Sequence, residues 1–400
     1  MKGFLALFPV VVILLSEIIR FSSDLHAQLM LMGSIFYMLI FMLHKLNYIY
    51  LVFIFILIPF FFLHFLISFN YLAASESTIR YFFPIIILFY SYSIREYFHV
   101  LFKFLLFYSV LSFFYQLVIY YNFFDGVSSQ WFYKELAKGV FGVNKQFGLI
   151  RATGLLGFFD AYGFLNFTMF FLVHYFYLGK RKYSLQLLFL LALFLSISFK
   201  LIFLFLFICL FFKAYRLKVM LFLSISVIAV FFFTSDMSMQ VLEKIETKVS
   251  AYVTDGNSAR AESYRVLFKE MKSVSIIGEG IGSFGGAAST KYNSPYYNKV
   301  NFNWYRTKNL TTTDTYFPHL FIELGIMTGC LYLLAILFPL FRIRHNKLSL
   351  KIILILYTML FFDSIFSFAL NNIAYLLFSL LLVYPIMYYV SSQKMRNELK

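Results

Sequence analysis

The sequence predicts an all-α, polytopic membrane helix bundle of about twelve spans with one large helical loop outside the membrane. The prediction rests on an apolar composition, apolar runs of spanning length, and a one-sided distribution of Lys and Arg. Of the 400 residues, 62% are hydrophobic and 13% are charged, against about 45–50% and about 25% in soluble domains. A water-soluble core could not enclose so much apolar surface, so lipid is the predicted surrounding solvent.

Apolar runs near the roughly 20 residues that cross a bilayer occur about twelve times. They cover approximately residues 3–19, 28–43, 48–69, 81–94, 97–121, 155–178, 184–199, 201–212, 217–233, 316–341, 350–370 and 373–390. The two runs around Lys200 are short and could instead form a re-entrant pair. Only Lys2 precedes the first run and no small-residue cleavage site follows it, which favours a retained span over a signal peptide.

The basic residues predict the orientation of the spans. With the N-terminus inside, the inner segments hold 16 Lys and Arg but only two acids, Glu96 and Glu398. The short outer loops hold only Arg20, Arg80 and Lys200. This asymmetry fits both termini in the cytoplasm. Most of the net charge of +16 is therefore topological, and no nucleic-acid partner is needed to explain it.

Two outer segments break the apolar pattern, at 122–153 and at 234–315. They divide the chain into a bundle of about nine spans at 1–233, an extracytoplasmic loop at 234–315, and C-terminal spans with a cytoplasmic tail at 316–400. Within the large loop, residues 236–254 have the apolar spacing of an amphipathic helix. A turn at 255–258 follows, in which Ser258 is suited to cap a second helix.

In that second helix Arg260, Tyr264 and Leu267 share one face with two further apolar residues. Arg260 is a permanent cation at the head of an apolar stripe, which favours either an anionic partner or a contact with the membrane interface. Arg265 falls on the solvated face.

A glycine-rich segment, 278–286, follows the second helix. Gly280, Gly282 and Gly285 match the spacing G-x-G-x-x-G, but a dinucleotide site also needs a βαβ unit and a later acidic residue, and both are missing here. The glycines suit either a tight turn or the close approach of backbone N–H groups to an anionic headgroup.

The chain then returns to the membrane with three ionisable residues, Asp314, His319 and Glu323. Charged groups at a membrane face are costly and point to a functional site. His319 and Glu323 are four residues apart and should lie side by side on one helix face. The structural alternative is that Asp314 caps the helix and Glu323 bonds to a neighbouring span. In the next span, Asp363 should face the bundle interior, and Lys103 of the fifth apolar run could either pair with it or snorkel to the membrane interface.

Four short motifs together resemble the superfamily of oligosaccharide repeat-unit polymerases and O-antigen ligases. They are Arg260 with Tyr264; Gly278-Glu279-Gly280; Glu323-Leu324-Gly325; and Arg151-Ala152-Thr153-Gly154 leading to Asp160. In the ligase branch a His stands eleven residues before the last glycine, where this chain has Asp314. The resemblance therefore favours the polymerase branch.

The resemblance implies a glycosyltransferase on the outer face of the bacterial cytoplasmic membrane. Both donor and acceptor would be glycans linked to undecaprenyl diphosphate in the membrane lipid, and a chain-length regulator could be a partner. Neither a metal nor a cofactor is implied. The candidate diphosphate-binding residues are Arg260, Arg151, Arg265 and Gly280, with Lys200 as a further cation. The candidate catalytic residues are Asp314, Glu323 and His319, whose side chains can accept a proton; His319 takes no role from the resemblance. Trp304 and Tyr305 could stack on sugar rings or anchor the loop at the interface.

Three alternatives remain open from the sequence. A ligase would use the same chemistry with a lipid or protein acceptor, a flippase would move the lipid-linked unit, and a structural component would have no activity. A flippase should show repeated halves and ionisable residues along a central cavity. Here the polar groups gather around one outer loop, which favours an enzyme at the surface. The identity of the sugars, and whether capsule or O-antigen is the product, stay open.

Overall fold

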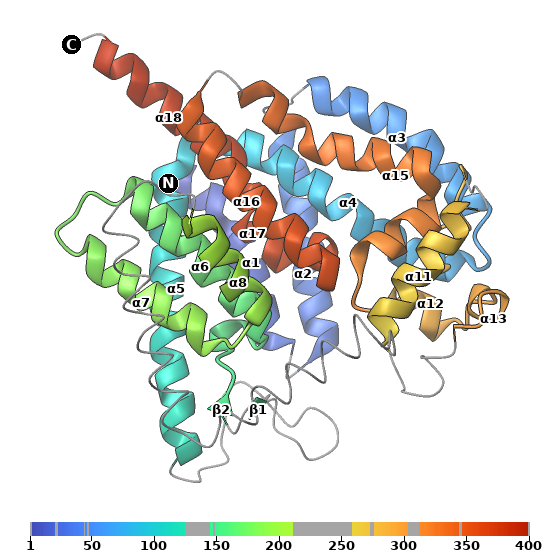
Figure 1. The fold of residues 1–400 in the computed structure, drawn as a ribbon. Helices are drawn as coiled ribbons and strands as arrows, with labels where there is room; N and C mark the ends of the chain where they lie inside the picture. The colour runs from blue at the N-terminus through green and yellow to red at the C-terminus, as the bar shows by residue number, and fades with distance from the viewer. Residues whose placement is uncertain are drawn as a thin grey trace.

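The computed structural model describes residues 2–20, 23–43, 45, 48–124, 145–146, 149–210, 258–272, 276–302, 312–343 and 346–398 (Figure 1). Within these ranges the all-α prediction is confirmed, because the strands are limited to the short antiparallel pair β1 (Lys145–Gln146) and β2 (Leu149–Ile150). The helices before the strands are α1 (Lys2–Ile19), α2 (Asp24–Met42), α3 (Tyr48–Leu66), α4 (Tyr71–Ser93) and α5 (Phe98–Phe124). After them come α6 (Phe159–Phe176), α7 (Lys182–Leu195), α8 (Phe199–Leu210), α11 (Ala259–Lys272), α12 (Ala287–Lys291), α13 (Tyr296–Lys299), α15 (Tyr316–Ile343), α16 (Lys347–Phe366), α17 (Ile373–Phe378) and α18 (Val383–Glu398).

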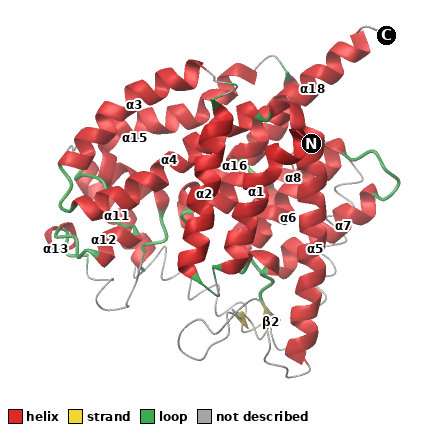
Figure 2. Cartoon of the chain, turned by 180° about the vertical axis from the view of Figure 1, so that it is seen from behind, coloured by secondary structure: helices red, strands yellow, loops and turns green. Residues whose placement is uncertain are grey.

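Six helical segments of the described chain are long and apolar enough to cross a membrane, which indicates a multi-pass membrane protein (Figure 2). They are Asp24–Met42, Tyr71–Ser93, Arg95–Asn122, Tyr316–Ile343, Lys347–Phe366 and Ile373–Gln393. Four further apolar helices are shorter: Gly3–Ile19, Tyr50–Leu66, Lys182–Leu195 and Phe199–Leu210. The count of about twelve spans thus stays a prediction, and its run at 217–233 lies outside the described residues.

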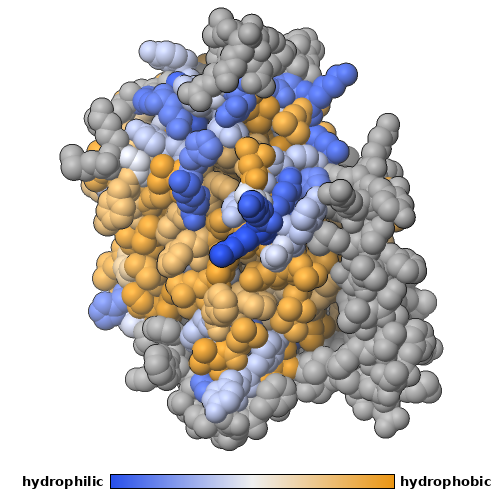
Figure 3. All heavy atoms as spheres, turned by 90° about the vertical axis from the view of Figure 1, so that its left-hand side faces the viewer, coloured by the Kyte–Doolittle hydropathy of each residue, from blue (hydrophilic) through white to orange (hydrophobic). Residues whose placement is uncertain are grey.

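The surface has the distribution expected of a chain that meets lipid. In Figure 3 apolar residues cover most of the middle of one face, and hydrophilic residues gather mainly toward one end of it. Large apolar side chains are exposed on the outer helices, among them Phe36 of α2, Phe55 of α3 and Phe107 of α5. Such a wide apolar surface is typical of contact with acyl chains.

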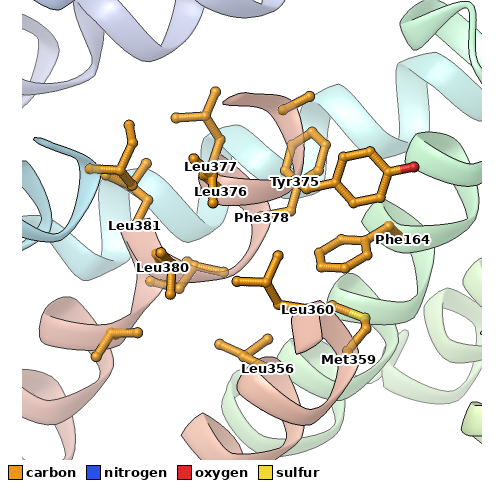
Figure 4. Close-up of a cluster of buried hydrophobic side chains, with 14 of the residues drawn as sticks. Phe164, Leu356, Met359, Leu360, Tyr375, Leu376, Leu377, Phe378, Leu380 and Leu381 are labelled. Atoms are coloured by element: carbon orange, nitrogen blue, oxygen red, sulfur yellow. The ribbon is translucent and has the colours of Figure 1, made fainter. Parts of the chain in front are cut away.

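The buried core lies where α6, α16 and α17 meet. Phe164 of α6, Leu360 of α16 and Phe378 of α17 converge there, and each is fully buried (Figure 4). Tyr375 of α17 belongs to the same cluster, and its hydroxyl points away from the leucine side chains. This core holds α16 in place, and the last turns of α16 border both groups of charged residues described below.

The loop before α15 has the start that the sequence predicts. α11 begins directly after Ser258, whose hydroxyl accepts a hydrogen bond from the backbone N–H of Ala261 (3.1 Å). The predicted N-cap is therefore confirmed. The expected amphipathic helix at 236–254 lies outside the described residues, as do Trp304 and Tyr305.

The orientation predicted from the basic residues can be tested by cysteine labelling. Lys291 on α12 is predicted to lie outside and Arg181, between α6 and α7, inside; both are exposed. In a Cys330→Ser background that removes the exposed native thiol, a membrane-impermeant maleimide should label Lys291→Cys in intact cells. Arg181→Cys should react only after the membrane is opened. The reverse pattern would invert the topology.

Candidate functional site

The glycine-rich segment forms a tight turn packed against the connection between α3 and α4. Gly280, Gly282 and Gly285 all adopt left-handed backbone conformations, with φ of 91°, 85° and 78°. A Cβ on Gly280 would lie 2.9 Å from the backbone of Ser68, and a Cβ on Gly282 would lie 2.7 Å from the Ala73 carbonyl carbon. Only glycine tolerates both the dihedral angles and this close approach.

The same turn also pairs with α15 at a kink. Gly325 has φ 68° within α15, and this kink lets the turn run alongside the helix. The N–H of Glu279 donates to the Ile322 carbonyl (2.8 Å), and the N–H of Gly280 donates to the Glu323 carbonyl (3.1 Å). The Gly280 N–H is thus already hydrogen-bonded within the protein. Of the two roles that the sequence allowed for these glycines, a tight turn or an anion-binding backbone, this bond fits the tight turn.

Glu323 connects this turn to two membrane helices through its side chain. The carboxylate is fully buried and accepts hydrogen bonds from the Phe284 N–H (3.1 Å) and the Tyr81 hydroxyl (3.0 Å). His319 lies 3.4 Å from the same carboxylate, as its spacing predicted, and its Nδ1 lies 2.5 Å from the Phe284 carbonyl oxygen. The His319 ring stacks on Tyr81. The contacts of these buried groups join α4, α15 and the turn. We call Tyr81, Phe284, His319 and Glu323 together the lock.

Arg260 and Asp314 lie at the open edge of this lock. They form an ion pair of 3.3 Å with side chains that are 36% and 55% exposed, respectively. Asp314 has a left-handed backbone (φ 54°), which Asp tolerates better than most residues, and it accepts a hydrogen bond from Thr312 (2.8 Å). Arg265, by contrast, is 61% exposed and pairs with Glu262 of its own helix (2.6 Å).

A second set of charges lies within the bundle, and we call it the buried charge cluster: Arg151, Asp160, Lys200 and Asp363. Lys200 of α8 pairs with Asp160 of α6 at 3.0 Å and also with Asp363 of α16. The sequence had offered Lys103 as the partner of Asp363, and this was wrong. Lys103 lies exposed on α5 and forms no ion pair with any described residue, because α8 rather than α5 packs on this part of α16.

Arg151 belongs to this cluster and not to the Arg260 pair. Its guanidinium donates to the carbonyls of Ser196 (3.2 Å) and Ile197 (2.8 Å), and lies 3.9 Å from Asp160. It also lies over the Phe159 ring. Burial lowers the pKa of Arg151 to about 10, and the Asp160 carboxylate opposes this shift. Two of the five guanidinium N–H donors therefore hold the connection between α7 and α8.

The last turns of α16 lie between the two sets of charges. The Tyr264 hydroxyl of α11 donates to the Ile365 carbonyl (2.8 Å), two residues after Asp363. On the same side, the His319 ring packs edge-on against Phe368. Ser367 donates to Asp363 at 2.9 Å. Helix α11, which carries Arg260, is thus bonded directly to the end of α16 that carries Asp363.

The sequence did not predict two interactions on which the site depends. One is the hydrogen bond from Tyr81 to Glu323, and the other is the ion pair of Lys200 with Asp363. The available signal was an ionisable residue inside an apolar run, which marks a site but not its partner. Among the described residues, no three His, Cys, Asp or Glu side chains form a group that could hold a metal ion.

Comparison with models of known protein families found no match. Comparison with curated proteins found no similar sequence either.

The close approach of Gly278 to α15 predicts a large effect of one methyl group. A Cβ there would lie 2.3 Å from the Glu323 carbonyl oxygen and 2.4 Å from the Gly325 nitrogen, so backbone must move. We expect Gly278→Ala to lower the free energy of unfolding by about 1–3 kcal/mol, measured by thermal unfolding in detergent.

Gly33→Ala on α2 is the matched control, because nothing lies within 4 Å of its added Cβ. It should be neutral or stabilising by up to about 1 kcal/mol. Equal unfolding temperatures for Gly278→Ala and Gly33→Ala would contradict the tight packing of the turn on α15.

Proposed function

We propose that the chain is a glycosyltransferase that polymerises oligosaccharide repeat units linked to undecaprenyl diphosphate, at the outer face of a bacterial cytoplasmic membrane. The observation that carries the proposal is the exposed Arg260–Asp314 pair at the edge of a buried lock. It places a cation beside a carboxylate where a lipid-linked headgroup could reach both.

Arg260 is the proposed binding group for the diphosphate. An exposed ion pair contributes only about 0–1 kcal/mol, so Arg260 can exchange Asp314 for phosphate oxygens at little cost. Its planar fork binds such oxygens bidentately. Arg151 is less available, since it donates to two carbonyls within the buried charge cluster.

Asp314 is the proposed general base. An acceptor sugar hydroxyl attacks the anomeric carbon of the donor, and its proton passes to the Asp314 carboxylate. The bond between that carbon and the diphosphate oxygen breaks, and the diphosphate leaves with the electron pair. Arg260 stabilises the negative charge that develops on the leaving group.

His319 and Glu323 have a positioning role in this proposal. Both are buried, and Glu323 already accepts hydrogen bonds from Phe284 and Tyr81. Neither side chain is open to a substrate hydroxyl. They fix the turn and the start of α15, and with it Asp314.

Arg260→Ala tests the diphosphate site. Losing one group that stabilises developing charge costs about 10²- to 10³-fold in rate, so long polymer should disappear while single repeat units remain on the carrier lipid. Arg260→Lys should have a rate between those of the wild type and Arg260→Ala, because Lys keeps the charge but lacks the planar guanidinium that binds two oxygens. The measurements are the glycan ladder of the strain and the turnover of purified protein.

Lys269→Ala is the matched control, an exposed cation on the same helix α11 that has no assigned role. It should give the wild-type ladder. If Arg260→Ala also gives wild-type chain lengths at equal protein level, the proposed function is wrong. If polymer forms but stays on the carrier lipid in a strain that lacks the chain, the activity is that of a ligase.

Asp314→Asn tests the general base separately. The change keeps the size and the bond from Thr312 but removes the proton acceptor, which should lower kcat by about 10²- to 10⁴-fold. Donor binding should persist, measured with the lipid-linked donor under single-turnover conditions. A loss of less than about tenfold would leave Asp314 with only a helix-start role.

A further inference from the structure

Two buried polar atoms lack a hydrogen-bond partner among the described residues, one in the buried charge cluster and one in Tyr375 of the neighbouring helix α17. One is Oδ2 of Asp363, whose other oxygen binds Lys200 and Ser367. The other is the hydroxyl of Tyr375, whose ring packs against Phe164 (4.9 Å between ring centroids), one turn after Asp160 on α6. The two side chains are 0% and 2% exposed. An unpaired buried polar group is costly, so these atoms indicate a binding position.

The cluster is buried but not sealed. Arg151, Asp160 and Lys200 keep 12%, 11% and 16% of their side-chain surfaces exposed, whereas Asp363 and Tyr375 are closed to solvent. The Tyr375 hydroxyl points away from the leucine-rich core (Figure 4). A small polar ring has to pass these partly exposed side chains to reach the two unpaired atoms.

The charges of the cluster select a neutral ligand. Arg151 and Lys200 are balanced by Asp160 and Asp363, so a bound anion or cation would leave a net charge in a place shielded from water. A neutral group with several hydroxyls adds no charge. Its O–H groups can donate to Asp363 Oδ2 and accept from the Tyr375 hydroxyl.

We propose that the buried charge cluster is a sugar-binding subsite, which takes the acceptor sugar ring through Asp363 and Tyr375. This inference rests on the proposed function, and it assigns the two parts of the substrate to two places. The diphosphate belongs to Arg260, and the neutral sugar belongs to the cluster. The Tyr264–Ile365 hydrogen bond connects the helix that carries Arg260 to the helix that carries Asp363.

Tyr375→Phe tests the subsite, because it removes one hydroxyl and no charge. The probe is the oligosaccharide repeat unit of the host's own polysaccharide, freed from lipid by mild acid and added to the full chain in nanodiscs. We expect its dissociation constant to rise about three- to tenfold, the effect of one lost hydrogen bond. Tyr357→Phe is the control, a buried tyrosine on α16 whose hydroxyl donates elsewhere, to Ile336, and it should leave the dissociation constant unchanged.

Inorganic diphosphate is the second probe and separates the two proposals. Diphosphate binding should be lost in Arg260→Ala and kept in Tyr375→Phe. The oligosaccharide should bind Arg260→Ala like the wild type and Tyr375→Phe about three- to tenfold more weakly. Asp363→Asn leaves Lys200 with one carboxylate, so Lys200→Met with Asp363→Asn restores charge balance. This double variant should fold like the wild type and bind the oligosaccharide more than tenfold more weakly.

Two results would overturn the sugar subsite while leaving the proposed function intact. One is equal oligosaccharide binding by the wild type, Tyr357→Phe, Tyr375→Phe and the double variant. The other is an acceptor KM that is unchanged in Tyr375→Phe when polymerisation is assayed directly. Conversely, wild-type polymer in the Arg260→Ala strain would defeat the proposed function, even if the oligosaccharide binds as expected.

Discussion

The hydrogen bonds of the buried Glu323 carboxylate are the interaction on which the geometry of the candidate site depends. The carboxylate accepts hydrogen bonds from the backbone of the glycine-rich turn and from Tyr81 of α4. A single side chain of α15 thereby connects its own helix to α4 and to the glycine-rich turn. Removing the Glu323 carboxylate would leave the Phe284 N–H and the Tyr81 hydroxyl buried without their hydrogen-bond acceptor. The positions of Gly280, His319 and Asp314 all follow from this connection.

The exposed and buried charges differ in what they can do. Arg260 and Asp314 are partly in water, where an ion pair is weak and can be exchanged for a ligand. Lys200 and Asp363 are almost fully buried, and separating them would leave an unpaired charge inside the bundle. The exposed pair is therefore suited to bind and release a charged headgroup, while the buried pair is suited to hold helices in place and to meet a neutral group.

Local patterns predicted much of this arrangement. Apolar runs predicted the helices, and Ser258 predicted the start of α11. The four-residue spacing of His319 and Glu323 predicted that their side chains lie together. Contacts between distant parts of the chain were not predictable. Whether Asp363 pairs with Lys103 or Lys200 depends on which helix packs against α16, and apolar spans carry little information on their neighbours. Tyr81 was missed for the same reason.

Burial also decides which acid can serve as a base. The sequence offered Asp314, Glu323 and His319 within ten residues, and all three are chemically able to accept a proton. Glu323 already accepts a hydrogen bond at each of its oxygens, and His319 lies closed between Tyr81 and Phe368. Asp314 is the exposed member, and it pairs with Arg260, the residue that we propose for binding the diphosphate. The four-residue spacing of His319 and Glu323 therefore serves to build the lock, and Asp314, just before the helix, is the residue that we propose as the proton acceptor.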